Sequence, residues 1–160
     1  VYKEWMHAEW TMMSRLWDEG APVPFPVART GDGMLMEYIG DREMAAPRLA
    51  QAGSAKHQLP PLFAQFRDGL LSFCRAGVVH GDLSPYNLLV WQEALWFIDL
   101  PQAVPYLANP NATDFLYRDV CNVCGWFARR GLDVDRELLF AEAMSELFEF
   151  KTKDLFVAQD

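Results

Sequence analysis

Apolar side chains recur along this chain with two different periods, and each change of period marks a new element. Residues 3–19 place them three and four positions apart, which predicts a helix that ends at Gly20. The same spacing predicts helices over residues 61–76, 112–130 and 134–150, and we expect the polar residues that follow to fray.

Short extended runs separate these predicted helices. Alternating prolines favour an extended segment over residues 21–31, and Gly31-Asp32-Gly33 is a turn signal that leads into a strand over residues 34–39. Residues 41–60 are polar and contain Pro and Gly, which predicts a loop with a short helix near residues 47–52.

Two central apolar runs, residues 78–90 and 96–104, carry polar side chains at their ends. We expect the runs to pair as a hairpin, because they are of strand type and are joined by a short turn. Pairing would bring Asp82 and Asn87 of the first run close to Asp99 of the second. The sequence therefore predicts a polar site at this hairpin.

The residue types at this site are those that phosphoryl transfer from a nucleotide requires. Magnesium prefers oxygen ligands, which Asn87 and Asp99 supply, and Asp82 is the candidate base for an acceptor hydroxyl. The spacing His-x-Asp-Leu-x-x-x-Asn, from His80 to Asn87, is that of a kinase catalytic loop. His80 lies at the edge of an apolar run, which favours a scaffold role over catalysis.

Composition limits the alternatives. A chain of 160 residues with 51% apolar and 14% aromatic content has enough apolar surface for one folded domain and is not typical of disorder. The net charge of −8 argues against non-specific nucleic-acid binding. The sequence has no apolar run of the roughly 18 residues that a membrane span needs, so we expect no membrane partner. The sequence gives no direct evidence for a nucleic-acid partner.

Three cysteines are an odd, small number, which favours reduced thiols and a cytoplasmic protein. Cys121 and Cys124 have the spacing of a redox or metal pair. They lie within a helical pattern, however, and with Cys74 they do not make the usual four zinc ligands. We expect thiols packed in the core or on a helix face.

The motifs around the predicted site resemble those of the RIO-type atypical serine/threonine protein kinases, especially the bacterial branch. The similarity covers roughly residues 1–145, and it rests on four segments: MEYIG at 36–40, HGDLSPYNLLV at 80–90, IDLPQAV at 98–104 and NPNATDFLYRDVCNVCGWF at 109–127.

This resemblance implies an α+β, protein-kinase-like fold. Residues 1–40 would form a partial N-lobe and hinge, with one helix and two to three short strands. Residues 41–150 would form a mostly helical C-lobe with a small catalytic hairpin, and residues 151–160 a tail.

The resemblance also implies roles for individual residues. Asp82 would be the catalytic Asp, and Asn87 and Asp99 would bind the metal of Mg-ATP. Asp99 would also accept a phosphoryl group transiently, giving an ATPase-like turnover. Nucleotide contacts and a loop-bracing carboxylate would come from further residues: the gatekeeper Met36, the hinge residues Glu37 and Ile39, Glu9 as the partner of a phosphate-binding Lys, and Asp119 as the brace of the catalytic loop.

Two parts of the family pattern are missing from this sequence. No Gly-rich loop and no strand bearing the phosphate-binding Lys precede the first helix, and Lys3 lies on that helix. We therefore expect the C-terminal part of a longer protein, with weak nucleotide binding and little or no catalysis by itself.

Two other functions remain open at this stage. Small-molecule phosphotransferases of the aminoglycoside and choline kinase type also carry His-Gly-Asp and a later Ile-Asp, although Ser84-Pro85-Tyr86 is not their usual interval. A non-catalytic pseudokinase binding module is the third interpretation. For a RIO-type kinase, the expected acceptor is a protein or ribosome-associated substrate.

Overall fold

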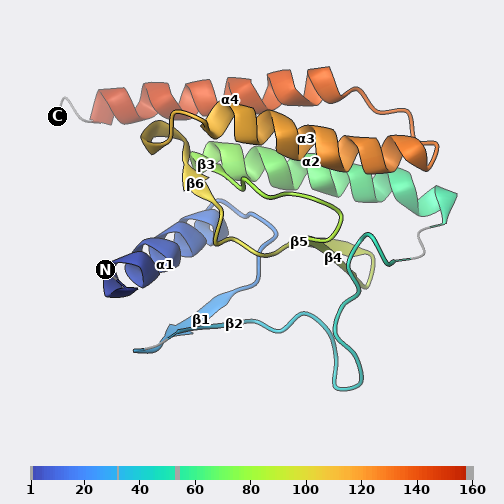
Figure 1. Ribbon diagram of the computed structural model, residues 1–160, viewed down its shortest axis with the longest axis horizontal. Coiled ribbons are helices and arrows are strands. Elements are labelled where there is room, and N and C mark those ends of the chain that lie inside the picture. Colours follow the sequence, from blue (N-terminus) through green and yellow to red (C-terminus); the bar gives the residue numbers. More distant parts are fainter. Residues whose placement is uncertain (1, 32, 53–54, 158–160) are drawn as a thin grey trace.

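The computed structural model describes residues 2–31, 33–52 and 55–157, with side chains described between residues 7 and 156. The long helices in this part of the chain are α1 (Tyr2–Asp18), α2 (Leu59–Arg75), α3 (Ala112–Arg129) and α4 (Arg136–Val157). Helices α2, α3 and α4 run side by side along the long axis, and α1 and most strands lie below them in Figure 1. Two short 3-10 turns, η1 (Lys56–Gln58) and η2 (Tyr106–Ala108), precede α2 and α3.

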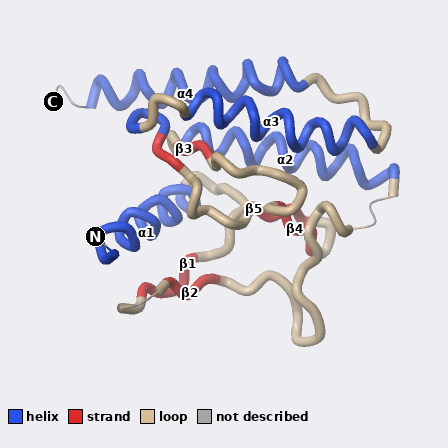
Figure 2. The backbone as a smooth tube through the Cα atoms, viewed as in Figure 1, coloured by secondary structure: helices blue, strands red, loops and turns tan. Residues whose placement is uncertain are grey.

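The described strands form three separate antiparallel pairs, seen as the short red segments in Figure 2. Strand β1 (Pro26–Arg29) pairs with β2 (Met34–Met36), and β3 (Val78–Val79) pairs with β6 (Val104–Pro105). Strand β4 (Leu88–Trp91) pairs with β5 (Ala94–Phe97) in register Leu88 to Phe97. The segment between β3 and β4 is therefore a loop fixed at both ends by strand pairing.

Helix α2 packs against β3 and β5, the strands that precede the two polar segments of the predicted site. Prolines occupy its first turn, where their missing N–H groups have no intrahelical partner to lose. Gly77, with φ of 70°, ends it, and a Cβ there would meet the ring of Phe150 on α4. Arg67 of α2 donates two 2.9 Å hydrogen bonds to Glu142 of α4, which fixes the two helices side by side.

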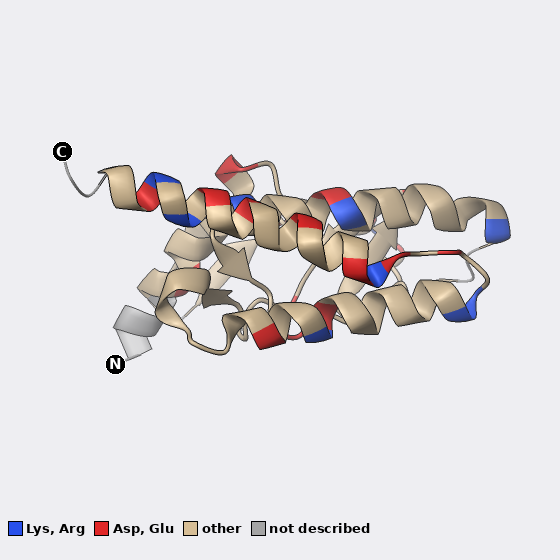
Figure 3. Ribbon diagram, turned by 90° about the horizontal axis from the view of Figure 1, so that it is seen from above, with Lys and Arg blue, Asp and Glu red and all other residues tan. Residues whose placement is uncertain are grey.

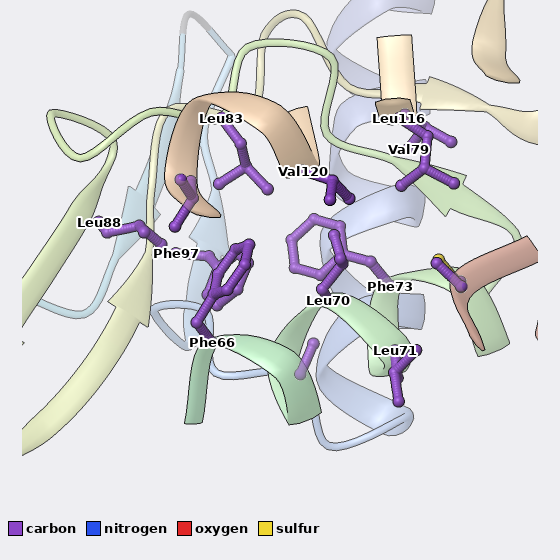
Figure 4. Packing of buried hydrophobic residues seen from close by; sticks show 14 of the residues in the cluster. Phe66, Leu70, Leu71, Phe73, Val79, Leu83, Leu88, Phe97, Leu116 and Val120 are labelled. Atoms are coloured by element: carbon purple, nitrogen blue, oxygen red, sulfur yellow. The ribbon is translucent and has the colours of Figure 1, made fainter. Parts of the chain in front are cut away.

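The core lies between α2, the central strands and α3, as Figure 4 shows. The ring of Phe97 on β5 stacks 6.0 Å from that of Phe66 and lies 5.2 Å from that of Phe73. Gly69 of α2 permits this approach, because a Cβ there would lie 2.5 Å from the Phe97 ring. Leu83, within the loop after β3, is fully buried in the same cluster and anchors the loop.

The four predicted helices and the pairing of the two central runs are confirmed, with three corrections. The hairpin is shorter than predicted, because only β4 and β5 form it, while the start of the first run pairs separately with β6. No helix forms at residues 47–52. The N–H groups of Leu49 and Ala50 instead donate hydrogen bonds to the carbonyls of Leu88 and Pro85. Helix α4 does not fray after residue 150 but continues to Val157. Asp32 of the predicted turn lies outside the described residues.

The two residues of the β4–β5 turn adopt a conformation that their side chains disfavour. Gln92 and Glu93 have φ of 49° and 65°, as in a type I′ turn, where Asn and Gly are preferred. Replacing them as Gln92→Asn with Glu93→Gly should raise the free energy of unfolding by about 0.5–1 kcal/mol. Chemical denaturation against wild type measures this, and a decrease in stability would contradict it.

The buried cysteines are core residues. Burial raises the pKa of Cys74 to about 12 and that of Cys124 to about 11, so neither is a thiolate near neutral pH.

Among the described residues, no helix has both the length and the apolar content to cross a bilayer.

Candidate active site

His80 connects the loop between β3 and β4 to the segment after β5. Its side chain is buried, with 1% exposed. Its Nδ1 accepts a 3.2 Å hydrogen bond from the N–H of Asp82, so Nε2 carries the proton and donates over 2.8 Å to the carbonyl of Ile98. This imidazole links the predicted catalytic Asp82 to the strand end that carries Asp99, which supports the predicted scaffold role.

Helix α3 holds the same loop from the other side. Asp119 is completely buried and accepts 2.8 and 2.9 Å hydrogen bonds from the N–H groups of Gly81 and Leu83. Arg118 donates to the carbonyl of Gly81, and Asn122 donates over 3.2 Å to the carbonyl of Leu83. Three side chains on one face of α3 therefore fix the peptides on either side of residue 82.

Opposing effects act on the Asp119 carboxyl. Burial raises its pKa, while the two N–H donors, His80 and Arg118 lower it and offset part of that rise. Each N–H group donates to a different oxygen of the Asp119 carboxyl, which suits the ionised form because both of its oxygens are acceptors. The sequence-based expectation that Asp119 braces the loop agrees with this geometry.

Asn87 lies against Asp82, as predicted. Its Nδ2 donates over 2.7 Å to the carbonyl of Asp82 and lies 3.4 Å from the carboxylate Oδ2 of the same residue. The main-chain carbonyl of Asn87 accepts a 3.1 Å hydrogen bond from Ile98, the residue before Asp99. The loop and the hairpin thus bring the three predicted residues to one end of the β4–β5 pair.

Asp99 leaves the strand in an unusual conformation. Its φ of 62° lies in the left-handed region, which costs a residue with a Cβ roughly 1 kcal/mol or more and often occurs at functional sites. The sharp bend turns the chain away from β5 and leaves the Asp99 side chain exposed. The conformation is available to Asp at lower cost than to β-branched residues.

The donor set fits magnesium. Both hydrogen bonds of the Asn87 side chain use its nitrogen, so its Oδ1 has no hydrogen-bond partner among the described residues. Asp82 and Asp99 add exposed carboxylates, and magnesium is commonly held by one or two carboxylates together with substrate phosphates. No group of three or more His, Cys, Asp or Glu side chains in the described chain forms a separate metal site.

Glu9, Met36 and Asp99 line one small cavity of about 200 Å³. Helix α1 supplies Glu9, β2 supplies Met36, and the bend after β5 supplies Asp99. Burial raises the pKa of Glu9, which has no ion pair among the described side chains. A larger hollow of about 690 Å³ lies near Arg75 and Phe150 and contains none of the predicted site residues.

The predicted hinge residues follow β2. The N–H of Glu37 donates to the carbonyl of Phe25 over 2.8 Å, and the carbonyl of Ile39 accepts from Ala46 over 3.0 Å. In the described part of the chain, these bonds leave the carbonyl of Glu37 and the N–H of Ile39 without a partner. Glu37 and Ile39 lie outside the cavity that Met36 lines, and the Glu37 carboxylate caps the N–H of Phe25 instead.

The sequence analysis missed Arg118 and Asn122. Both lie on α3 near Asp119, and each hydrogen bond to the loop joins residues that are more than 35 positions apart in the sequence. The available signal was spacing alone, since Asn122 follows Asp119 by three positions and therefore shares its helix face.

A profile of the RIO domain matches residues 1–139 of this chain. The chain belongs to the RIO family. The RIO-type serine/threonine-protein kinase Rio1 of Haloferax volcanii is 36% identical over 154 residues, which are 96% of this chain and 49% of that protein. Rio1 of Thermoplasma acidophilum is 33% identical over 131 residues, 82% of this chain and 67% of its own length. Human RIO1 is 30% identical over 95% of this chain and 26% of its own.

A solved structure extends the comparison to the fold. The structure of WaaP in complex with acyl carrier protein superposes with a TM-score of 0.59 at 19% identity, over 88% of this chain and 65% of that one. This likeness supports the predicted α+β, protein-kinase-like fold and nothing more specific. The RIO match favours a protein-kinase family over the aminoglycoside-type alternative. The chain spans about half the length of its Haloferax relative.

Proposed function

We propose that the protein of which this chain is a part transfers the γ-phosphoryl group of Mg-ATP to a hydroxyl, as a RIO-type serine/threonine kinase or ATPase. The observation that carries the proposal is the convergence of Asp82, Asn87 and Asp99 on one end of the β4–β5 pair. Little covalent chemistry is needed from a protein in such a reaction, so rigid placement of these groups is its main contribution.

Asp82 is the proposed base. Its side chain is exposed while both of its backbone groups are held, so the carboxylate faces a substrate from a fixed main chain. It would accept the proton of a serine or threonine hydroxyl during transfer. Asn87 Oδ1 and Asp99 would hold the magnesium ion, which would neutralise charge on the phosphates when bound.

The nucleotide is proposed to lie between β2 and the Asp99 bend. The free carbonyl of Glu37 and the free N–H of Ile39 form an acceptor and donor pair that suits the edge of adenine. Met36 and Glu9 line the inner cavity beside Asp99, where Glu9 would pair with a lysine supplied by the rest of the protein.

We also propose a cytoplasmic protein, because its three cysteines are unpaired. Its similarity to serine/threonine-protein kinases of the RIO type supports a protein or ribosome-associated substrate.

Asp99→Asn tests the metal site. The substitution removes the charged ligand but suits the left-handed backbone, because Asn adopts that region as readily as Asp. We expect Mg-ATP to bind the full-length protein about ten- to a hundredfold more weakly, with ATP affinity in EDTA unchanged. Calorimetric titration with and without magnesium measures both affinities.

The matched control is Asp133→Asn, which neutralises an exposed carboxylate on the loop between α3 and α4. It should leave both affinities unchanged. Equal Mg-ATP affinity of wild type and Asp99→Asn would contradict the assignment of Asp99, and absence of ATP binding to the wild-type full-length protein would contradict the proposed function.

A further inference from the structure

Five side chains hold all six backbone polar groups of residues 81–83. Asp119 takes both flanking N–H groups, while His80 and Asn87 take the N–H and carbonyl of Asp82. The two remaining carbonyls belong to Gly81 and Leu83, and they accept hydrogen bonds from Arg118 and Asn122. The backbone around Asp82 is therefore fixed at every polar atom.

These side chains differ in what else they support. Asp119 is fully buried, His80 is almost fully buried, and Asn87 belongs to the proposed metal site, so removing any of them changes stability or ligand binding as well as loop geometry. Arg118 also stacks over the ring of Phe115, with its guanidinium 5.1 Å from the ring centroid. Asn122 is different, because it lies at the surface of α3 and its one described hydrogen bond goes to the loop.

The bond from Asn122 acts at a sensitive point of the loop. It holds the carbonyl of Leu83, the residue immediately after Asp82 and immediately before the turn that carries Asn87. That turn begins at Ser84, whose carbonyl and hydroxyl accept from the N–H groups of Asn87 and Tyr86. Rotation of the peptide between Leu83 and Ser84 would move both the proposed base and the proposed metal ligand.

We propose that Asn122 is a positioning residue for phosphoryl transfer, which fixes the peptide after Leu83 and thereby sets the relative placement of Asp82 and Asn87. The proposal rests on the proposed function for its effect on turnover, but its effect on the loop is independent of activity. Helix α3 would then contribute to the site twice: through the buried Asp119, which accepts from two loop N–H groups, and through Asn122, which donates to the Leu83 carbonyl.

The test compares Asn122→Ala with Asn122→Gln in the full-length protein. Loss of the single hydrogen bond in Asn122→Ala should lower kcat roughly tenfold, since about 1.4 kcal/mol corresponds to tenfold. KM for ATP should stay at the wild-type value, because Asn122 lies outside the cavity beside Asp99. The melting temperature should fall by no more than about 4 °C, because only one hydrogen bond to the loop is lost. Asn122→Gln keeps an amide donor and should recover most of kcat, and Arg129→Ala, exposed on the last turn of α3, is the control.

Amide hydrogen exchange supplies a measurement that does not depend on turnover. In Asn122→Ala, the N–H groups of Asp82 and Leu83 should exchange about tenfold faster, with unchanged protection in α2. Unchanged exchange in the loop with kcat within twofold of wild type overturns the proposal. A fall in melting temperature of more than about 4 °C with faster exchange across α2 also overturns it. An Asn122→Gln protein as slow in turnover as Asn122→Ala does so too. Absence of turnover in the wild type contradicts the proposed function, and the exchange result still decides the role of Asn122.

Discussion

Replacing Asp82 by Asn is expected to lower the turnover of the full-length protein by roughly 10²- to 10⁴-fold, the usual contribution of a positioned base. The backbone contacts of residue 82, to His80 and Asn87, do not involve its carboxylate and should survive the substitution. Asn has the same shape but does not accept the proton of an acceptor hydroxyl. The loss should therefore appear in kcat, while ATP affinity changes by less than about threefold because Asp82 does not line the cavity proposed for the nucleotide.

Steady-state kinetics with a protein substrate or with ATP hydrolysis, together with an ATP titration, separates the two parameters. Asp68→Asn is the matched control, because it neutralises an exposed carboxylate on α2 whose described ion pair is with Arg67 and not with the loop. Turnover of Asp82→Asn equal to that of wild type would refute the role of Asp82 as base.

Replacing Asp119 by Ala is expected to have the largest effect on stability. It leaves the N–H groups of Gly81 and Leu83 buried without partners, and it removes a fully buried side chain. Each unsatisfied buried donor costs about 1–3 kcal/mol, so the free energy of unfolding should fall by about 3 kcal/mol or more. Asp119→Asn keeps one acceptor oxygen and should lose about half as much.

Urea unfolding of wild type, Asp119→Ala and Asp119→Asn gives these differences directly. The control is Asp114→Asn on the first turn of the same helix, where the side chain is exposed and a change within about 0.5 kcal/mol is expected. An Asp119→Ala protein within 1 kcal/mol of wild type would show that the loop does not depend on this carboxylate. Because Asp119 supports folding, reduced activity of its variants would not by itself distinguish a catalytic effect.

The distribution of charge agrees with a site built from local contacts rather than from a long-range field. Figure 3 shows acidic and basic positions interspersed along the helices, and several of them pair across α2 and α4. The pairs Arg67–Glu142 and Arg75–Glu146 are partly exposed, and such pairs stabilise a fold only modestly.

The sequence by itself determined the helices and predicted which residues meet at the centre. Apolar spacing was sufficient for α2 and α3, because each buries one continuous face whose period is set by the helix itself. The spacing from His80 to Asn87 and the later Asp99 predicted that Asp82, Asn87 and Asp99 lie close together, and the structure brings them to one end of the β4–β5 pair, while their roles stay a prediction. The RIO family was also readable from these segments, and the domain match agrees with it.

Only the tertiary structure decided how the loop is held. Arg118 and Asn122 act on atoms of Gly81 and Leu83, and hydrogen bonds to main-chain carbonyls leave no mark in the pattern of side chains. The continuation of α4 to Val157 is also visible only in the structure, because residues 151–154 are polar and Leu155 and Phe156 are exposed, so the sequence beyond Phe150 has no buried face that marks a helix. The positive φ of Asp99 is a third example, because surrounding contacts impose a conformation that local preference opposes.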